Sequence, residues 1–206
     1  MTIGPDVIQK TIQDRYPTLT VAFNGPASAT EIADAERKLG VEFPEDFKQF
    51  YLAANGQQLD ERGCGTGVPC IPRLPFGGES SETCTWGEFL SLDGIVLATL
   101  AHRELQEVDD YFSEFEDDNE LIGPVTVHRS HVIFCDPGTG DCIGLDLSPA
   151  DGGQRYQVVA INHEGPDLAC LADSFSQFLA LVVDQISSSE VVYSEEEECF
   201  VPAAEA

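Results

Sequence analysis

The stretch Val41-Glu-Phe-Pro-Glu-Asp-Phe-Lys-Gln-Phe-Tyr-Leu-Ala-Ala-Asn-Gly56 decides how the first half of this chain is expected to fold. Its apolar residues recur at i, i+3, i+4 and i+7, which places them on one helix face: Phe47, Phe50, Tyr51 and Ala54. Pro44 suits the first helical position, because the N–H that proline lacks would have no helical partner there. Asn55-Gly56 supplies residues that tolerate a positive φ just past the last turn. The stretch therefore predicts a short packing helix that carries no catalytic group.

A second helix is predicted immediately before this one. Ser28-Ala-Thr-Glu31 has the spacing of a capping box, in which each side chain bonds the backbone N–H of the other residue. Ile32, Ala35 and Leu39 then form an inward stripe, and Gly40 ends the helix. Because only a few residues separate the two helices, we expect them to pack against each other.

The second half of the chain predicts strands and one closing helix. Strands are expected at His131–Cys135, Cys142–Leu147 and Gln157–Ile161, and a turn rich in Gly and Asp joins the first two as a hairpin. A helix capped by Asp173 or Ser174 follows. Its predicted inward stripe consists of Phe175, Phe178, Leu179, Val182, Val183 and Ile186. This order indicates an α+β fold with an N-terminal helix pair, a central antiparallel sheet and a C-terminal helix.

The length and composition of the chain predict one main domain with two appendages. The domain is expected at residues 26–186, after an N-terminal arm at 1–25. Residues 187–206 contain six Glu and no basic residue, so they predict a mobile acidic tail. Residues 57–88 are rich in Gly and Pro and predict an irregular insertion. This insertion carries three cysteines, whose role the sequence leaves open: Cys64, Cys70 and Cys84.

The charge balance points to the kind of partner. The chain has 37 Asp and Glu against 10 Lys and Arg, which gives a formal net charge of -27. Such a surface repels phosphate backbones and anionic lipids, so we expect neither nucleic acid nor a membrane as the partner. A basic protein is the natural complement, because opposite potentials speed encounter and select partners. Solubility, or an origin in a halophilic or acidic proteome, is the alternative explanation of the charge.

One region concentrates this charge. A helical pattern is expected from about 97 to 116, and nine acidic residues but no Lys or Arg lie between Glu104 and Glu120. The alternative interpretation is an ordinary solvated helix face. We interpret the region as a partner-binding surface for a basic protein, for example a toxin domain, in which aromatic residues lie beside the acids. The predicted contact residues are Glu107, Asp110, Tyr111, Glu114, Glu116, Asp117 and Asp118.

Motifs typical of enzymes are absent from the sequence. It has no Gly-x-Ser-x-Gly, no P-loop and no His-Glu-x-x-His. A structural zinc site on the three cysteines of the insertion, or a Cys–His hydrolase, stays an alternative, although no Cys-x-x-Cys spacing occurs and nothing selects a Cys–His pair. We therefore assign no catalytic, metal-binding or cofactor-binding residue. An odd number of cysteines, no apolar signal segment and no membrane span predict a reducing cytoplasm.

Two cysteines, Cys135 and Cys142, lie at the turn ends of the predicted hairpin strands. If Asp136 and Asp141 face each other across a four-residue loop, Cys135 and Cys142 are direct cross-strand neighbours. Two buried free thiols are the favoured interpretation, and a strained, redox-labile disulfide is the alternative.

Two parts of the sequence resemble the SUKH superfamily, also called the Smi–Knr family. The first is Thr30–Gly56, with an acidic helix, Leu-Gly, an apolar residue, Pro and an aromatic helix that ends in Asn-Gly. The second follows the family order through Asp146-Leu-Ser-Pro-Ala-Asp-Gly-Gly153, Gln157-Val-Val159 and Ala172–Leu179. Tyr156 stands where the family commonly has Gly, which raises a question about the local turn.

The resemblance implies a function in protein binding. Bacterial members are mostly immunity proteins, which neutralise a cognate toxin that is often a nuclease, and fungal members regulate cell-wall synthesis and signalling. It also implies architectural roles for motif residues: packing for Leu39, Phe47 and Phe50, a left-handed backbone for Gly56, and a turn for Asp146. A binding module of the immunity kind is thus expected, with a regulatory scaffold as the second possibility and a thiol or metal hydrolase as the third.

Overall fold

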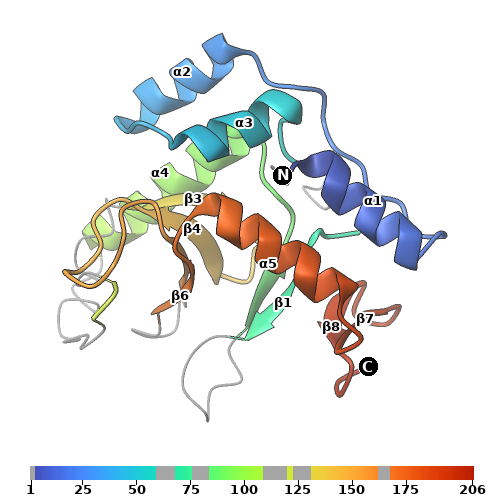
Figure 1. The fold of residues 1–206 in the computed structure, drawn as a ribbon. Helices are drawn as coiled ribbons and strands as arrows, with labels where there is room; N and C mark the ends of the chain where they lie inside the picture. Colours follow the sequence, from blue (N-terminus) through green and yellow to red (C-terminus); the bar gives the residue numbers. More distant parts are fainter. Residues whose placement is uncertain (1–2, 59–67, 76–83, 109–119, 123–130, 162–167) are drawn as a thin grey trace.

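The structure is a computed structural model that describes residues 3–58, 68–75, 84–108, 120–122, 131–161 and 168–206 (Figure 1). Helices and strands are both present, as expected of an α+β fold. The helices are α1 (Pro5–Arg15), α2 (Ala29–Leu39), α3 (Glu45–Ala53), α4 (Leu92–Val108) and α5 (Phe175–Ser187). The strands are β1 (Ile71–Pro75), β2 (Cys84–Gly87), β3 (His131–Cys135), β4 (Cys142–Asp146), β5 (Val158–Ile161), β6 (Leu168–Ala172), β7 (Val191–Ser194) and β8 (Cys199–Pro202).

The central sheet is antiparallel, as the sequence predicts. Its four strands follow the order β3-β4-β5-β6, and two smaller antiparallel pairs are formed by β1 with β2 and by β7 with β8. The three predicted strands are confirmed to within one residue at either end, whereas β6 was not predicted. Its sequence Leu-Ala-Cys-Leu-Ala lacks the β-branched and aromatic residues that usually indicate a strand. Pairing with β5 therefore decides its conformation.

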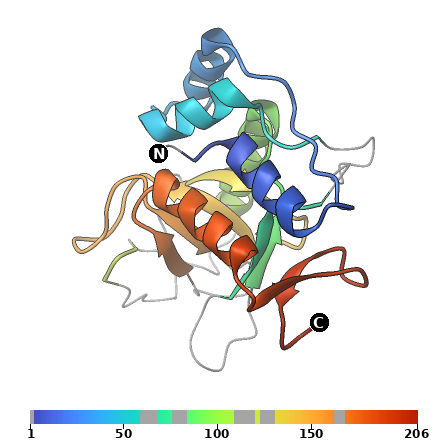
Figure 2. The same cartoon turned by 45° about the vertical axis from the view of Figure 1, so that its right-hand side comes forward.

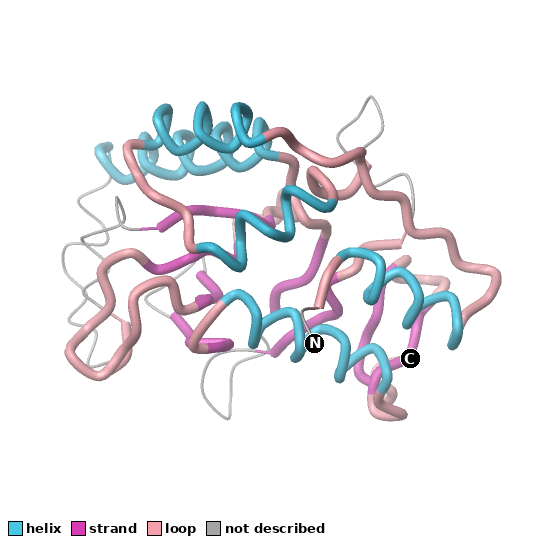
Figure 3. The backbone as a smooth tube through the Cα atoms, turned by 45° about the horizontal axis from the view of Figure 1, so that its top comes forward, coloured by secondary structure: helices cyan, strands magenta, loops and turns pink. Residues whose placement is uncertain are grey.

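The helices cover the sheet and pack against one another. α5 contacts α1, α3, β1 and β6, and Figure 2 shows α1 and α5 side by side. α4 packs between α2 and β3, so that α2 and α4 form the edge of the molecule that lies uppermost in Figure 3. Ser28 and Glu31 form the predicted capping box at the start of α2, and Ser174 caps α5. Pro44 is the N-cap of α3 rather than its first helical residue, because its ψ of 155° is extended.

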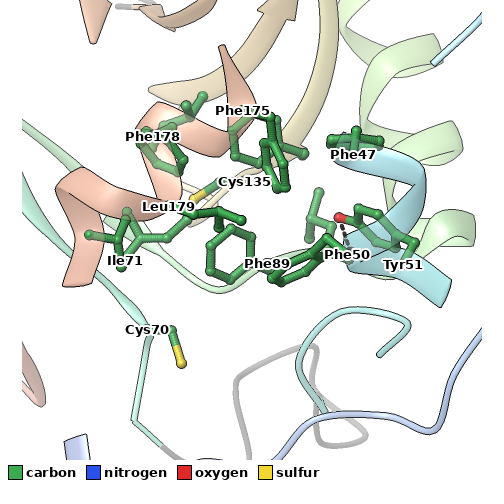
Figure 4. Close-up of a cluster of buried hydrophobic side chains, with 14 of the residues drawn as sticks. Phe47, Phe50, Tyr51, Cys70, Ile71, Phe89, Cys135, Phe175, Phe178 and Leu179 are labelled. Carbon is green, nitrogen blue, oxygen red and sulfur yellow. Dashed lines mark hydrogen bonds between the residues drawn. The ribbon is translucent and has the colours of Figure 1, made fainter. Parts of the chain in front are cut away.

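The aromatic residues of the opening stretch lie at the centre of the core (Figure 4). Phe47 of α3 approaches Phe175 of α5 with ring centroids 4.8 Å apart, and Phe50 lies at the same distance from Phe89. Phe134 of β3 meets Phe175 edge-on at 5.3 Å. Each buried phenylalanine contributes about 2–3 kcal/mol of burial free energy, so these contacts join α3, α5 and the sheet firmly.

The Asn-Gly end of the opening stretch is held by a network of hydrogen bonds. Gly56 has a φ of 70°, and a Cβ placed on it would lie 2.4 Å from the Leu90 carbonyl oxygen. The buried Gln57 side chain donates to the Val68 carbonyl at 3.0 Å and accepts from the N–H groups of Cys70 and Phe89. Position 56 therefore requires a glycine, as the resemblance implied. The side chain of Gln57 joins its own segment to those of residues 68–70 and Phe89.

Both ends of the chain are more ordered than the sequence indicated. The expected arm at 1–25 contains α1, whose Ile8 and Ile12 are buried, and the expected mobile tail at 187–206 contains the β7–β8 hairpin. Tyr16 and Phe200 have ring centroids 5.6 Å apart, which joins the two ends. Burial of aromatic side chains outweighs the repulsion between glutamates that had suggested a mobile tail.

Other expectations also need correction. The insertion at 57–88 is not wholly irregular, because β1 and β2 lie within it and Cys70 is buried in the core. The helix expected from about 97 begins at Leu92, and its described part ends at Val108. Of the three cysteines of the insertion, Cys64 lies outside the described residues.

The expected pairing of two hairpin cysteines is wrong. A bulge between Ile133 and Cys135 shifts the register, so that Cys135 pairs with Ile143 and not with Cys142. Both cysteines are buried free thiols, which agrees with the favoured interpretation of their chemistry. The bulge inserts one residue into β3, an irregularity that turn residues alone do not reveal.

Candidate partner-binding surface

Most of the predicted acidic patch lies outside the described residues. Glu107 belongs to the last turn of α4. The other six predicted contact residues fall in the segment 109–119, which the structure does not describe: Asp110, Tyr111, Glu114, Glu116, Asp117 and Asp118. Their role in binding stays a prediction. The candidate surface is therefore built from the described residues that precede and follow this segment in the chain.

The outer face of α4 carries exposed leucines between carboxylates. Leu97 is 73% exposed and Leu100 is 40% exposed. Asp93 and Glu104 are also exposed and lie at i and i+11, on the helix face that the two leucines share at i+4 and i+7. We call these four residues the α4 stripe. The sequence alone does not reveal the stripe, because apolar residues of α4 occur on every face of the helix.

The inner face of α4 is held by hydrogen bonds to three neighbouring segments. The Ile133 N–H of β3 donates to the buried Thr99 hydroxyl at 3.0 Å, and the Arg103 side chain donates to the Leu39 carbonyl at 2.9 Å. At the start of the helix, the Leu92 N–H donates to the Asn55 side chain at 2.8 Å. The stripe therefore projects from a helix whose position is fixed along its described length.

A small hollow lies where α2 approaches the start of α4. Its volume is about 160 Å³. Lys38 of α2 and Asp93 of the α4 stripe face each other here, with Nζ and the carboxylate oxygen 3.6 Å apart. The Asp93 carboxylate is 94% exposed, so this ion pair is weakly held. The lining residues are Glu31, Asp34, Ala35, Lys38, Asn55, Leu92 and Asp93.

The family motif around Asp146 anchors the chain that follows the undescribed acidic segment. Gln157 donates through Nε2 to the Asp146 carboxylate at 2.9 Å and to the Leu121 carbonyl at 2.8 Å. A Cβ on Gly153 would lie 2.0 Å from that carbonyl oxygen, so only glycine admits the Leu121 backbone. Burial raises the pKa of Asp146, and hydrogen bonds from the Ser148 N–H and from Gln157 partly offset this effect. The expected turn is thus confirmed, and it fixes residues 120–122.

The basic side chains of the described chain are all engaged within the molecule. Two of the ten, Arg62 and Arg129, lie outside the described residues. Five of the other eight form ion pairs with acidic residues: Lys10, Arg37, Lys38, Lys48 and Arg73. Arg15 and Arg103 donate to backbone carbonyls, and Arg155 lies over the Tyr156 ring. Little positive charge therefore remains to offset the acidic surface.

The reactive residue types do not form an evident reaction centre in the part of the chain that the structure describes. No group of three or more His, Cys, Asp or Glu side chains could hold a metal ion there. Burial raises the pKa of the Cys70, Cys135 and Cys142 thiols, which disfavours the reactive thiolate. Burial lowers the pKa of His102, with Asp136 opposing this effect. Burial therefore disfavours each of these three cysteines as a thiolate nucleophile.

The fold and these motifs define a small α+β domain of the SUKH class. The chain belongs to the SMI1 / KNR4 family (SUKH-1), because the model of this family matches residues 26–181, three quarters of the sequence. The match includes α2 to β6 and the start of α5, but not α1 or the β7–β8 hairpin.

One curated relative supports the assignment, and a second is similar to a short part of the chain. One is KNR4/SMI1 homolog 1 of Debaryomyces hansenii, which is 23% identical over an alignment of 213 positions that covers 82% of this chain. The other is the uncharacterized protein YnaB of Bacillus subtilis, which is 52% identical over 40 residues, or 19% of this chain. The alignments span 47% and 28% of these relatives' own lengths. Among the described residues, no helix is long and apolar enough to cross a membrane.

Proposed function

We propose that this chain is a non-enzymatic protein-binding module, most simply an immunity protein that neutralises a cognate toxin by docking an acidic surface on it. The observation that carries the proposal is the imbalance of charge in a SUKH-1 domain. The net charge is -27, and the basic residues of the described chain all have partners within it. A basic protein would gain favourable electrostatic energy over a wide area of this surface. Such a partner acts in the same reducing cytoplasm that the cysteines suggest.

The predicted acidic patch lies next to the α4 stripe in the sequence. It follows α4 directly in the chain, and the described residues on its other side, 120–122, are anchored by Gln157 and Gly153. A binding segment held at both ends loses less conformational entropy when its partner docks. We propose that the patch and the α4 stripe act together against one partner.

Co-expression tests this proposal. The chain is expressed together with each of a set of candidate toxin domains, and growth is measured with and without the chain. We expect the chain to restore growth, and we expect Asp110→Lys combined with Glu114→Lys to weaken rescue and binding at least tenfold, because each change replaces an attraction by a repulsion. Glu195→Lys combined with Glu196→Lys is the matched control, since it makes the same change of charge on the hairpin between β7 and β8. Absence of rescue, or equal effects of both pairs, would contradict the proposal.

A regulatory scaffold is the second candidate. The relationship to KNR4/SMI1 homolog 1 favours it, because that alignment covers 82% of this chain. In this case the bound partner would be a protein of the same cell whose activity persists in the complex. Measuring the activity of a co-purified partner with and without the chain separates regulation from neutralisation.

A further inference from the structure

We propose that the α4 stripe is a docking seat for an amphipathic basic helix of the partner protein. The inference rests on the proposed function, because it names the structural class of the partner segment and the surface that receives it. Its basis is the arrangement of two exposed leucines between two exposed carboxylates on a helix whose inner face is fixed. The partner segment would place apolar side chains on the leucines and one cation near each carboxylate.

The apolar centre of the stripe consists of neighbouring exposed side chains. Leu97 and Leu100 lie three positions apart on α4, and Ala101 is exposed beside them. A single exposed leucine is common on protein surfaces, but neighbouring ones on one helix face form a continuous apolar strip. Covering such a strip releases its hydration water and favours association. A partner that carries only charge would leave this surface uncovered.

The carboxylates specify the charge and the spacing of the partner. Asp93 and Glu104 are eleven residues apart, which is about 16 Å along a helix that rises 1.5 Å per residue. A partner helix with cations at a similar spacing can reach both ends while its apolar face covers the leucines. At the Asp93 end, Glu31 and Asp34 also line the hollow, and their carboxylates already bind Ser28 and Arg37. The ion pair between Lys38 and Asp93 is long, at 3.6 Å, and exposed to solvent. A cation of the partner can therefore replace Lys38 at small cost in free energy.

The rigidity of α4 favours binding at this surface. Hydrogen bonds fix the helix at its start, middle and later turns, through Leu92, Thr99 and Arg103. A surface that is already in its bound conformation spends little free energy on ordering. The hairpin tip with its exposed Glu195–Glu198 is the contrasting acidic surface, because it offers charge without an exposed leucine. An amphipathic basic peptide should therefore bind the α4 stripe more tightly than the hairpin tip.

The test uses a synthetic 18-residue peptide with leucines on one helix face and lysines on the other, together with a scrambled peptide of the same composition. Each is titrated into the full-length, ¹⁵N-labelled chain at low salt while backbone amide shifts are recorded. We expect the largest shift changes on α4 from Asp93 to Glu104, and at least tenfold weaker binding of the scrambled peptide. We expect Leu97→Ala combined with Leu100→Ala to weaken binding at least tenfold.

A matched control separates the site from a general loss of apolar surface. Leu52→Ala combined with Leu121→Ala truncates two exposed leucines on other segments, and it should change affinity less than twofold. Unchanged amide spectra away from the substitutions establish that each variant is folded. Binding that persists in the α4 double variant, or shift changes centred on the hairpin tip, would overturn the docking seat and leave the proposed function standing. Failure of both peptides to bind at low salt would count against the seat and against acidic docking itself.

Discussion

The Asp46 carboxylate of α3 accepts a hydrogen bond of 2.8 Å from the Ser176 N–H in the first turn of α5. Its other oxygen accepts from the N–H of Phe47, the next residue along α3. The negative charge thus lies at the positive end of the α5 dipole and joins two helices that are 130 residues apart in the chain. The stretch 41–56 therefore fixes the position of α5 as well as contributing to the core.

This contact makes Asp46 a stabilising residue despite its position near the surface. We expect Asp46→Ala to lower the free energy of unfolding by about 1 kcal/mol, because a helix N-terminus loses an acceptor and a favourable charge. Denaturation by urea measures the change. Glu45→Ala in the same turn is the control, since the Glu45 carboxylate is exposed and accepts only from Gln49. Equal losses in the two variants would show that the contact to α5 is unimportant.

Two glycines of similar backbone conformation should respond very differently to substitution. Gly40 and Gly56 have φ values of 69° and 70°, but a Cβ on Gly40 meets no atom within 4 Å. We expect Gly40→Ala to cost about 1 kcal/mol, the strain of a left-handed alanine, and Gly56→Ala to cost at least about 3 kcal/mol. The additional loss comes from overlap with the Leu90 backbone, 2.4 Å away. Thermal unfolding of both variants gives the comparison, and equal losses would exclude the overlap.

Tyr156 occupies a position that glycine commonly fills in this family, and its φ is 71°. Because a left-handed conformation costs a residue with a Cβ about 1–2 kcal/mol, we expect Tyr156→Gly to be more stable than Tyr156→Ala by about 1 kcal/mol. The alanine variant is the control, because it removes the same contact with Arg155 but keeps the backbone strain. Urea denaturation provides the two stabilities. An alanine variant as stable as the glycine variant would show that the turn is unstrained.

The capping box of α2 should make stability depend on pH. Hydrogen bonds from the Ser28 side chain and backbone N–H lower the pKa of Glu31 below 4.5. A carboxyl whose pKa is lower in the folded state contributes stability that is full above the unfolded pKa and is lost as pH falls through the folded pKa. We expect the stability difference between the wild type and Glu31→Gln to be full at pH 6, to shrink only once the pH falls below the unfolded pKa of Glu31, and to be smallest below the folded pKa. A difference that stays constant over this range would contradict the role of the carboxylate.

Strong local patterns explain what the sequence predicts well. α2 has a capping box and an apolar stripe, and β3 has Gly and Asp residues just beyond its end, so local chemistry alone indicates both. The β7–β8 hairpin is different, because its four consecutive glutamates indicated a mobile acidic tail instead of a strand pair. Arg73 pairs with Glu197 at 3.1 Å, and Phe200 packs on Tyr16. These partners come from distant parts of the chain, so only the folded structure brings them together.

The sequence predicts the acidic patch but not the α4 stripe, for a similar reason. Counting charges finds the acidic run after Glu104, since that property is local. The α4 stripe is hidden, because the run from Ile95 to Leu100 contains apolar residues on every side of the helix. Tertiary packing decides that Ile95 is buried and that Leu97 is 73% exposed. The spacing of Asp93 and Glu104 around two leucines indicates a binding surface only when the buried face of α4 is known.

The central claim is that the acidic surface of this chain draws in a basic protein partner. The most direct measurement is the association rate constant with the partner recovered by co-purification, followed as the ionic strength is raised from about 0.02 M to 0.5 M. Opposite charges steer encounter only when they are weakly screened, so we predict a fall of at least tenfold in the association rate and a small change in the dissociation rate. An association rate that does not depend on salt would contradict the account.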